Sequence, residues 1–310
     1  MLEPAVIVLR LGQYLGAMVL FGSSIFALYA LPRTGSVATG ALRWLRPLLA
    51  WSAAGLLIAC LLGLLAQTSV LAGSLSEGLK LSSLSAVVTT MGFGRSAVVR
   101  AVGAGLALLL LVLRRPDRAT LVVCASLGAV VCGSLAWMGH GASTEGAGGP
   151  LHLGADIFHA LAAGLWIGAL ASFLFVLKWR PDDNAELDRI RHKALHGFSG
   201  IGSALVAVLV ASGLVNSWFL VSPTRLSGLW TTPYGQLLSL KLVLFMGMLG
   251  LAAANRFRLT PALGSDLGTD GAQVAPLAEL RRSLIIESSL AFAVLALVAW
   301  FGMLAPVSAQ

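Results

Sequence analysis

Apolar residues occur along this chain in eight long runs, separated by shorter stretches that carry the polar and charged residues. The runs cover residues 9–31, 47–67, 96–113, 119–138, 153–177, 198–220, 236–254 and 283–304. Each run approaches the ~20 residues that an α-helix needs to cross the hydrocarbon core of a bilayer. Each is predicted to be helical, because unpaired backbone groups are too costly in lipid. The pattern therefore predicts an all-α integral membrane protein, a bundle of about eight transmembrane helices.

The basic residues between these runs indicate how the bundle is oriented. Of the 21 Lys and Arg residues, 15 lie in four connections, 32–46, 114–118, 178–196 and 255–282. All four fall on one side of an eight-span bundle, and the positive-inside rule assigns that side to the cytoplasm. We therefore expect a multi-pass protein of a bacterial inner membrane. Both termini and the connection 68–95 are expected on the periplasmic side.

A short pattern occurs once in each half of the chain. Residues 90–94, followed by Arg100, and residues 231–235, followed by Lys241, both read T-x-x-aromatic-Gly with a basic residue six positions later. The order of the matched pieces favours two halves of four helices, 1–150 and 151–310. An even number of spans per half predicts a parallel repeat about an axis along the membrane normal. Chance similarity among Gly- and Leu-rich helices is the alternative.

Composition excludes several classes of protein. Hydrophobic residues make up 57% of the chain and charged residues only 11%, whereas about a quarter of the residues of a soluble domain are charged. A soluble enzyme or a disordered regulator is therefore excluded. The net charge of +8 follows from the basic cytoplasmic connections, and no nucleic-acid motif accompanies it. There is no Ser-His-Asp set, no phosphate loop and no pair of carboxylates in a common span, so no enzymatic activity is expected.

The histidines are the residues best suited to bind a ligand. His140, His152 and His159 lie near the outer ends of the fourth and fifth runs, and Met138 closes the fourth run. His152 and His159 are seven residues apart, so they face the same side of a helix. Imidazole and thioether ligands together suit copper, and a thioether favours Cu(I). We therefore predict a metal site formed by these four residues, with hydrated histidines and a packing methionine as the alternative.

A second pair of histidines and the three cysteines receive different interpretations. His192 and His196 have i,i+4 spacing among basic residues, which favours contact with lipid headgroups over an exit site for the metal. Cys60, Cys124 and Cys132 lie within apolar runs and form no CxxC pair. They are interpreted as small buried apolar residues.

Four ionisable residues fall within or at the start of the apolar runs, where they are costly and therefore informative. Asp156 opens the fifth run, and Arg100, Lys241 and Glu287 lie inside the third, seventh and last runs. Lys241 and Arg100 are predicted to face an acidic partner or an anionic ligand, with Asp156 as the expected partner of Lys241. The alternative is that both long side chains extend to the interface.

The segment FHALAAGLWIGAL, in which His159 precedes Trp166 and Gly168, is similar to the opening signature of the CopD copper-resistance family, the PcoD-like proteins. Later pieces follow in that family's order: Phe198-Ser199, Ser212-Gly213-Leu214, Thr232-Pro233-Tyr234-Gly235, Leu238, Lys241 and Asn255-Arg256. The resemblance covers about residues 153–258. It implies an inner-membrane protein that handles copper, commonly beside a periplasmic copper-binding partner of the CopC type. His159, Trp166, Tyr234 and Lys241 match positions of the family pattern.

Together these features predict a protein that imports copper, as Cu⁺ or Cu²⁺, from the periplasm to the cytoplasm. No ATPase motif is present, so transport would be downhill or coupled to another gradient. One alternative is an electron carrier that holds b-type haem, for which His140 and His159 are the nearest candidate pair. Another is a non-transporting assembly or sensor subunit. The expected partners are the bilayer and the periplasmic protein, and a homo-oligomer remains an alternative to a monomer.

Overall fold

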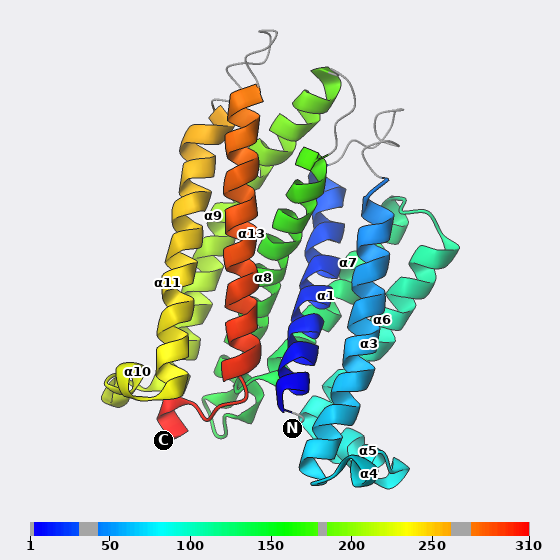
Figure 1. Ribbon diagram of the computed structural model, residues 1–310, viewed down its shortest axis with the longest axis vertical. Coiled ribbons are helices and arrows are strands. Elements are labelled where there is room, and N and C mark those ends of the chain that lie inside the picture. The colour runs from blue at the N-terminus through cyan, green and yellow to red at the C-terminus, as the bar shows by residue number, and fades with distance from the viewer. Residues whose placement is uncertain (1–2, 31–42, 179–184, 262–273, 310) are drawn as a thin grey trace.

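Eight long helices form an elongated bundle in which helices that follow one another in the chain run alternately up and down (Figure 1). The computed structural model describes residues 3–30, 43–178, 185–261 and 274–309. Among these residues there is no strand, and eight helices are long and apolar enough to cross a membrane. The predicted all-α bundle of eight spans is confirmed. The spans are α1 (Glu3–Ala30), α3 (Leu45–Leu71), α6 (Gly92–Leu113), α7 (Arg118–Gly133), α8 (Gly149–Lys178), α9 (Ala185–Val221), α11 (Pro233–Ala254) and α13 (Val274–Phe301).

Several helices begin where the sequence supplies a cap. The Asp117 carboxylate accepts a hydrogen bond from the Thr120 backbone N–H at 2.8 Å, which starts α7. The Thr232 hydroxyl accepts from the Gly235 N–H at 3.1 Å, and Pro233 occupies the first turn of α11. Such caps satisfy backbone donors that the first turn leaves free. The two copies of the repeated pattern lie at the starts of α6 and α11, while the full 4+4 repeat stays a prediction.

Three expected connections contain helical residues. The connection 68–95 includes α4 (Leu75–Gly78) and α5 (Leu81–Thr90), α9 already begins at Ala185, and α13 begins at Val274. The apolar runs did not predict these helical residues. The reason is that polar helical segments at the ends of a bundle contain no long apolar run from which a helix could be predicted. His192 and His196 lie in α9, but their side chains are outside the described residues.

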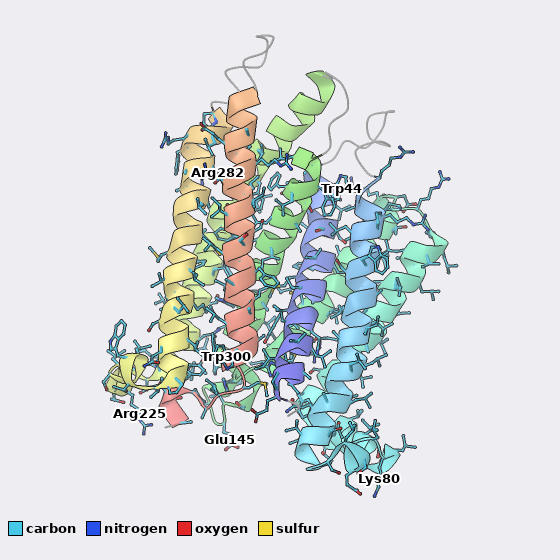
Figure 2. The ribbon with its side chains drawn as sticks, viewed as in Figure 1. Trp44, Lys80, Glu145, Arg225, Arg282 and Trp300 are labelled. Atoms are coloured by element: carbon cyan, nitrogen blue, oxygen red, sulfur yellow. The ribbon has the colours of Figure 1, made fainter. Side chains whose placement is uncertain are left out.

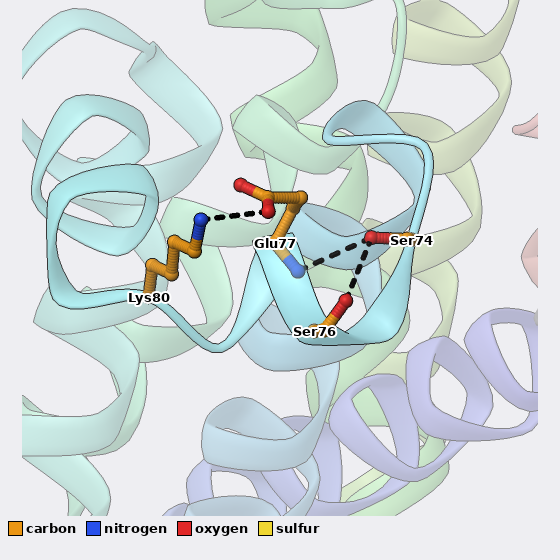
Figure 3. A network of polar contacts seen from close by, with 4 residues as sticks. All are labelled: Ser74, Ser76, Glu77 and Lys80. Atoms are coloured by element: carbon orange, nitrogen blue, oxygen red, sulfur yellow. Dashed lines mark hydrogen bonds and ion pairs between the residues drawn. The ribbon is translucent and has the colours of Figure 1, made fainter.

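The short helix α4 is fixed by local polar contacts (Figure 3). The Ser74 hydroxyl accepts a hydrogen bond from the Glu77 backbone N–H at 3.2 Å and lies 3.2 Å from the Ser76 hydroxyl. Lys80 Nζ is 2.7 Å from Glu77 Oε1, and no other ion pair joins described residues. Both side chains of the pair are exposed, so this ion pair contributes little stability.

Helix α1 is central to the packing and lies between two groups of helices (Figure 1). It packs on α3 and α7 on one side and on α8 and α13 on the other. Its contact with α8 is very close, because a Cβ atom at Gly22 would collide with the Gly164 carbonyl and the Gly168 backbone. The Ser23 hydroxyl also donates to the Gly168 carbonyl at 3.0 Å. Small residues thus allow the two halves of the bundle to meet backbone to backbone.

The surface of the bundle is that of a membrane protein. Large apolar side chains of the spanning helices, such as Trp51, Val243 and Met246, are mostly exposed. Charged residues gather at its ends: Figure 2 shows Lys80 and Arg225 at one end and Arg282 near the other. The start of α1 and the end of α13 lie at the same end, called here the terminal end (Figure 1). An even number of spans requires this arrangement.

Candidate functional site

One face of α8, a mostly apolar helix, carries four polar side chains. His152, Asp156, His159 and Trp166 follow one another at intervals of four, three and seven residues. These intervals place side chains on a single face of a helix. Fourteen residues of helix rise by about 21 Å, which is most of the ~30 Å thickness of a hydrocarbon core. The face therefore forms a polar column along much of the second half of the bundle, starting at the terminal end.

His152 begins the column in a buried position. Its side chain is 1% exposed and stacks on Phe219, with ring centroids 4.7 Å apart and the rings tilted by 9°. Its Nδ1 atom lies 2.7 Å from the Thr144 hydroxyl. Its Nε2 atom is buried and has no hydrogen-bond partner. One ring nitrogen is thus oriented by a neighbour, and the other is left open to a ligand.

His140 presents a second open nitrogen nearby. It follows the 3₁₀ turn η1 (Ser134–Met138), and its ring centroid lies 6.0 Å from that of Tyr234. The ring donates a hydrogen bond to the Leu304 carbonyl, while its Nε2 is buried without a partner. Burial lowers the pKa of His140, which favours the neutral imidazole that a metal requires. His140 and His152 are also close enough to interact electrostatically.

Asp156 ties the loop after η1 to two helices. Its Oδ1 accepts a hydrogen bond from Asn216 Nδ2 of α9 at 2.9 Å, and the Gly141 backbone N–H donates to the same carboxylate. A Cβ atom at position 141 would lie 2.5 Å from Asp156 Oδ2, so a side chain there would displace the Asp156 carboxylate. Gly141 begins the 3₁₀ turn η2 (Gly141–Ser143). Asn216 thus forms a hydrogen bond between α9 and α8.

Lys241 lies near Asp156 without forming a contact ion pair. Its charge acts on both Asp156 and His159, and its Nζ lies 5.9 Å from the Phe301 ring centroid. Among the described residues, no carboxylate oxygen comes within 4.0 Å of Lys241. Asp156 is therefore an electrostatic neighbour of Lys241, as the sequence led us to expect, but at a longer range than a hydrogen-bonded pair.

His159 is held by a serine of α9. Its Nδ1 lies 3.0 Å from the Ser212 hydroxyl, which itself donates to the Val208 carbonyl at 2.6 Å. Because the hydroxyl proton is already used, Ser212 accepts the hydrogen bond from Nδ1–H. The Nε2 atom of His159 lies on the side of the ring away from that bond. Sequence reasoning missed Ser212, because only the fold places it opposite His159.

The far end of the column is a buried carboxylate. Glu287 of α13 is 2% exposed, and its two oxygens accept from Trp166 Nε1 at 2.8 Å and from Asn255 Nδ2 at 3.0 Å. Asn255 begins the π-helical turn η4 (Asn255–Leu259). A cavity of about 400 Å³ adjoins these three residues and continues past Arg256, towards the end of the bundle opposite the termini. Trp166 and Glu287 were selected separately from the sequence, and the fold joins them.

The structure does not bring all the predicted ligands together. In the part of the chain that it describes, no three His, Cys, Asp or Glu side chains gather closely enough to hold one metal ion. His159 is thus not part of a three-residue group with His140 and His152. Met138 lines a different cavity, in the first half, and its carbonyl accepts from Arg10 at 2.9 Å. Cys60, Cys124 and Cys132 are free and buried, as predicted.

Arg100 lies outside the column and does not extend to the interface. It is 2% exposed. Its Nε donates to Gln13 Oε1 at 3.0 Å, and its Nη1 donates to the Ser96 hydroxyl at 3.1 Å and to the Ser134 carbonyl at 2.9 Å. The alternative that the Arg100 side chain extends to the membrane interface was therefore wrong. Arg100 joins α1, α6 and the end of α7 within the first half of the bundle.

Comparison with known proteins agrees with this description. Residues 1–150 match the family model described as "Copper resistance protein D-like, N-terminal domain", and residues 192–301 match "Copper resistance protein D". The chain is 35% identical to Copper resistance protein D of Pseudomonas syringae pv. tomato over 306 residues, which cover 98% of this chain and 97% of that protein. No solved structure matches.

Two other relatives match over part of their length. The inner membrane protein YebZ of Escherichia coli (strain K12) is 33% identical over 136 residues, 43% of each chain. The copper transport protein CutJ of Bacillus subtilis (strain 168) is 34% identical over 108 residues, 34% of this chain and 18% of that protein. None of these descriptions favours the haem alternative. The eight spans, the two matching family models and the full-length relative identify this chain as a member of the copper resistance protein D family.

Proposed function

We propose that this protein carries copper across the inner membrane, from the periplasm to the cytoplasm, along the polar face of α8. The observation that carries the proposal is the polar column itself, which begins with two buried histidine nitrogens that have no partner and ends at a buried carboxylate. Polar and ionisable groups inside a membrane bundle are costly, so they commonly mark a path for ions. Copper is the cargo of this path and not a resident cofactor.

The entry point is the pair formed by His140 and His152. A buried polar atom without a partner costs about 1–3 kcal/mol, and each ring carries one such nitrogen. A copper ion bound to both Nε2 atoms would satisfy them, and imidazole nitrogen suits copper. The Thr144 hydroxyl and the Leu304 carbonyl fix the opposite ring nitrogens, which is how neighbours of ligating histidines orient them.

The middle of the column favours passage over storage. His159 offers one further imidazole nitrogen, and Asp156 offers a carboxylate one turn nearer the entry. Lys241 places a positive charge beside both residues, which opposes long residence of a cation. Conduction requires sites that bind an ion strongly enough to admit it and weakly enough to release it. Loosely grouped ligands meet that requirement better than a closed metal cage.

The exit lies at Glu287 and the adjoining cavity. The Glu287 carboxylate is held by Trp166 and Asn255, and the cavity beside it leads to the end where basic residues gather. By the positive-inside rule that end is cytoplasmic, which places both termini in the periplasm. A periplasmic copper-binding protein of the CopC type would then deliver copper near His152. The chain supplies no chemistry of its own, and movement is downhill or coupled to another gradient.

Copper accumulation in cells tests this proposal against a non-transporting role. Cells that express the protein should accumulate more copper than cells that lack it, and His152→Gln should reduce that gain by at least about tenfold. His192→Ala, at the opposite end of the bundle, serves as the matched histidine control and should retain the gain. Equal protein levels in the membrane fraction are required for the comparison. Unchanged copper content on expression would favour an assembly or sensor subunit and overturn the proposal.

A further inference from the structure

A second cavity lies at the terminal end of the first half, apart from the α8 column. Its volume is about 230 Å³, below the range of about 300–1,000 Å³ typical of pockets for larger organic ligands. It lies among α1, α3, α6 and η1, and its polar lining residues are Arg10, Gln13, Gln67 and Arg100. Two guanidinium groups thus share one small cavity, and none of the residues that line it is acidic.

In the described part of the chain, no carboxylate oxygen lies within 4.0 Å of either guanidinium group. The ionisable groups that act on Arg100 are Cys60, Tyr14 and Arg10, and none of them is a carboxyl group. Arg10 donates to the carbonyls of Met138 at 2.9 Å and Gly302 at 3.5 Å, while its Nε is buried without a partner. Two like charges near each other, away from bulk water, are unfavourable unless an opposite charge joins them.

The guanidinium group of Arg100 is held in a fixed orientation. Its Nε and Nη1 are engaged by Gln13, Ser96 and the Ser134 carbonyl, and the Cys60 thiol also contacts the guanidinium group. Gln13 is fixed in turn, because its Nε2 donates to the Ala59 carbonyl at 3.2 Å. A donor that is oriented before binding loses little entropy when a ligand arrives.

We propose that this cavity binds a small inorganic anion between Arg10 and Arg100. The size of the cavity, its two guanidinium groups, the free carboxamide of Gln67 and the lack of acidic lining residues all fit such a ligand. Charge-assisted hydrogen bonds from arginine are among the stronger contacts available to an anion. The bound anion neutralises the cluster that joins α1, α6 and the end of α7.

Thermal unfolding of the purified full-length protein tests the site with chloride as the probe. Replacing gluconate with chloride at constant ionic strength should raise the unfolding temperature by on the order of 2 °C, because a ligand of the native state stabilises it. Arg10→Gln should lose this shift. Arg95→Gln removes the same charge from an exposed position of α6 and should keep it. No copper is present, so the result does not depend on the proposed transport function.

Three outcomes would overturn the anion site. One is an absence of any chloride-dependent shift in the native protein, which would leave an acidic segment of a partner as the better candidate for the two charges. Another is an equal shift in Arg10→Gln. The third is a shift that appears only when phosphatidylglycerol is added, which would assign the cavity to a lipid headgroup. Iodide quenching of tryptophan fluorescence gives a second readout, because Trp137 lines the cavity. Bound chloride should protect the Trp137 fluorescence from iodide. Trp137→Phe should remove the part of the fluorescence that chloride protects.

Discussion

The contact between Trp166 and Glu287 offers a quantitative test of the column. Trp166→Phe removes the indole N–H that donates to Glu287 Oε1 at 2.8 Å, while an aromatic ring still faces Phe245. Glu287 is 2% exposed, so water cannot readily replace the lost donor. Only Asn255 then remains as a donor to this carboxylate.

The expected cost follows from the chemistry of the bond. A hydrogen bond to a charged group contributes about 1.5–3 kcal/mol, and a buried oxygen left without a donor keeps most of that penalty. The smaller phenyl ring adds a packing loss that is unrelated to Glu287. A double-mutant cycle with Glu287→Leu, which removes the acceptor, separates the two terms, because the packing loss is common to both backgrounds.

Equilibrium unfolding in mixed detergent micelles measures the four free energies of the cycle. The coupling between Trp166 and Glu287 should be about 1.5–3 kcal/mol. Trp166→Phe should also slow copper transport, because the carboxylate at the end of the path is no longer held in place. A coupling below about 0.5 kcal/mol, within the error of additivity, would refute the role given to this hydrogen bond.

Four further predictions follow from the fold and the site. Gly22→Ala should destabilise the bundle by about 1–3 kcal/mol through a collision with α8, whereas Gly55→Ala, which meets open space, should be neutral or stabilising in the same unfolding assay. Alkaline phosphatase fused after the last residue should be active, and a reporter active only in the cytoplasm should be inactive there. Lys241→Met should impair copper accumulation, and adding Asp156→Asn should partly restore the amount of folded protein, because the unpaired buried acid costs several kcal/mol. The hydrogen bond from the Thr120 backbone holds the pKa of Asp117 below its ordinary value of 3.8. Asp117→Ala should therefore lower the unfolding temperature at neutral pH, and the difference should disappear as the pH falls below that value and the wild-type carboxylate becomes protonated.

The eight spans could be predicted because the bilayer imposes a length and a backbone requirement that long apolar runs alone satisfy. The ends of the helices were harder to predict. α4 and α5 are short, and the beginning of α9 is polar, so no apolar run marks them. Leu75 of α4 and Leu81 of α5 are exposed, which indicates that these two helices lie along the membrane surface instead of crossing the bilayer.

Some features of the candidate site could likewise be predicted from the sequence, and others could not. Spacing along the chain placed His152 and His159 on one face of a helix, because helical periodicity is local information. The sequence could not pair Trp166 with Glu287, since 121 residues separate them and only tertiary packing brings them together. The contact of the Gly141 backbone N–H with Asp156 carries no side-chain signal at all.

Copper flux into proteoliposomes measures the central claim most directly. The purified protein, reconstituted alone around a copper-sensitive fluorophore, should admit copper from the side that carries the termini. His152→Gln and His140→Gln should each reduce the initial rate by at least about tenfold, while Arg95→Gln, exposed on α6, should leave it unchanged. Wild-type vesicles that take up copper no faster than protein-free vesicles, or His152→Gln vesicles that match the wild type, would contradict a copper path that begins at this histidine pair.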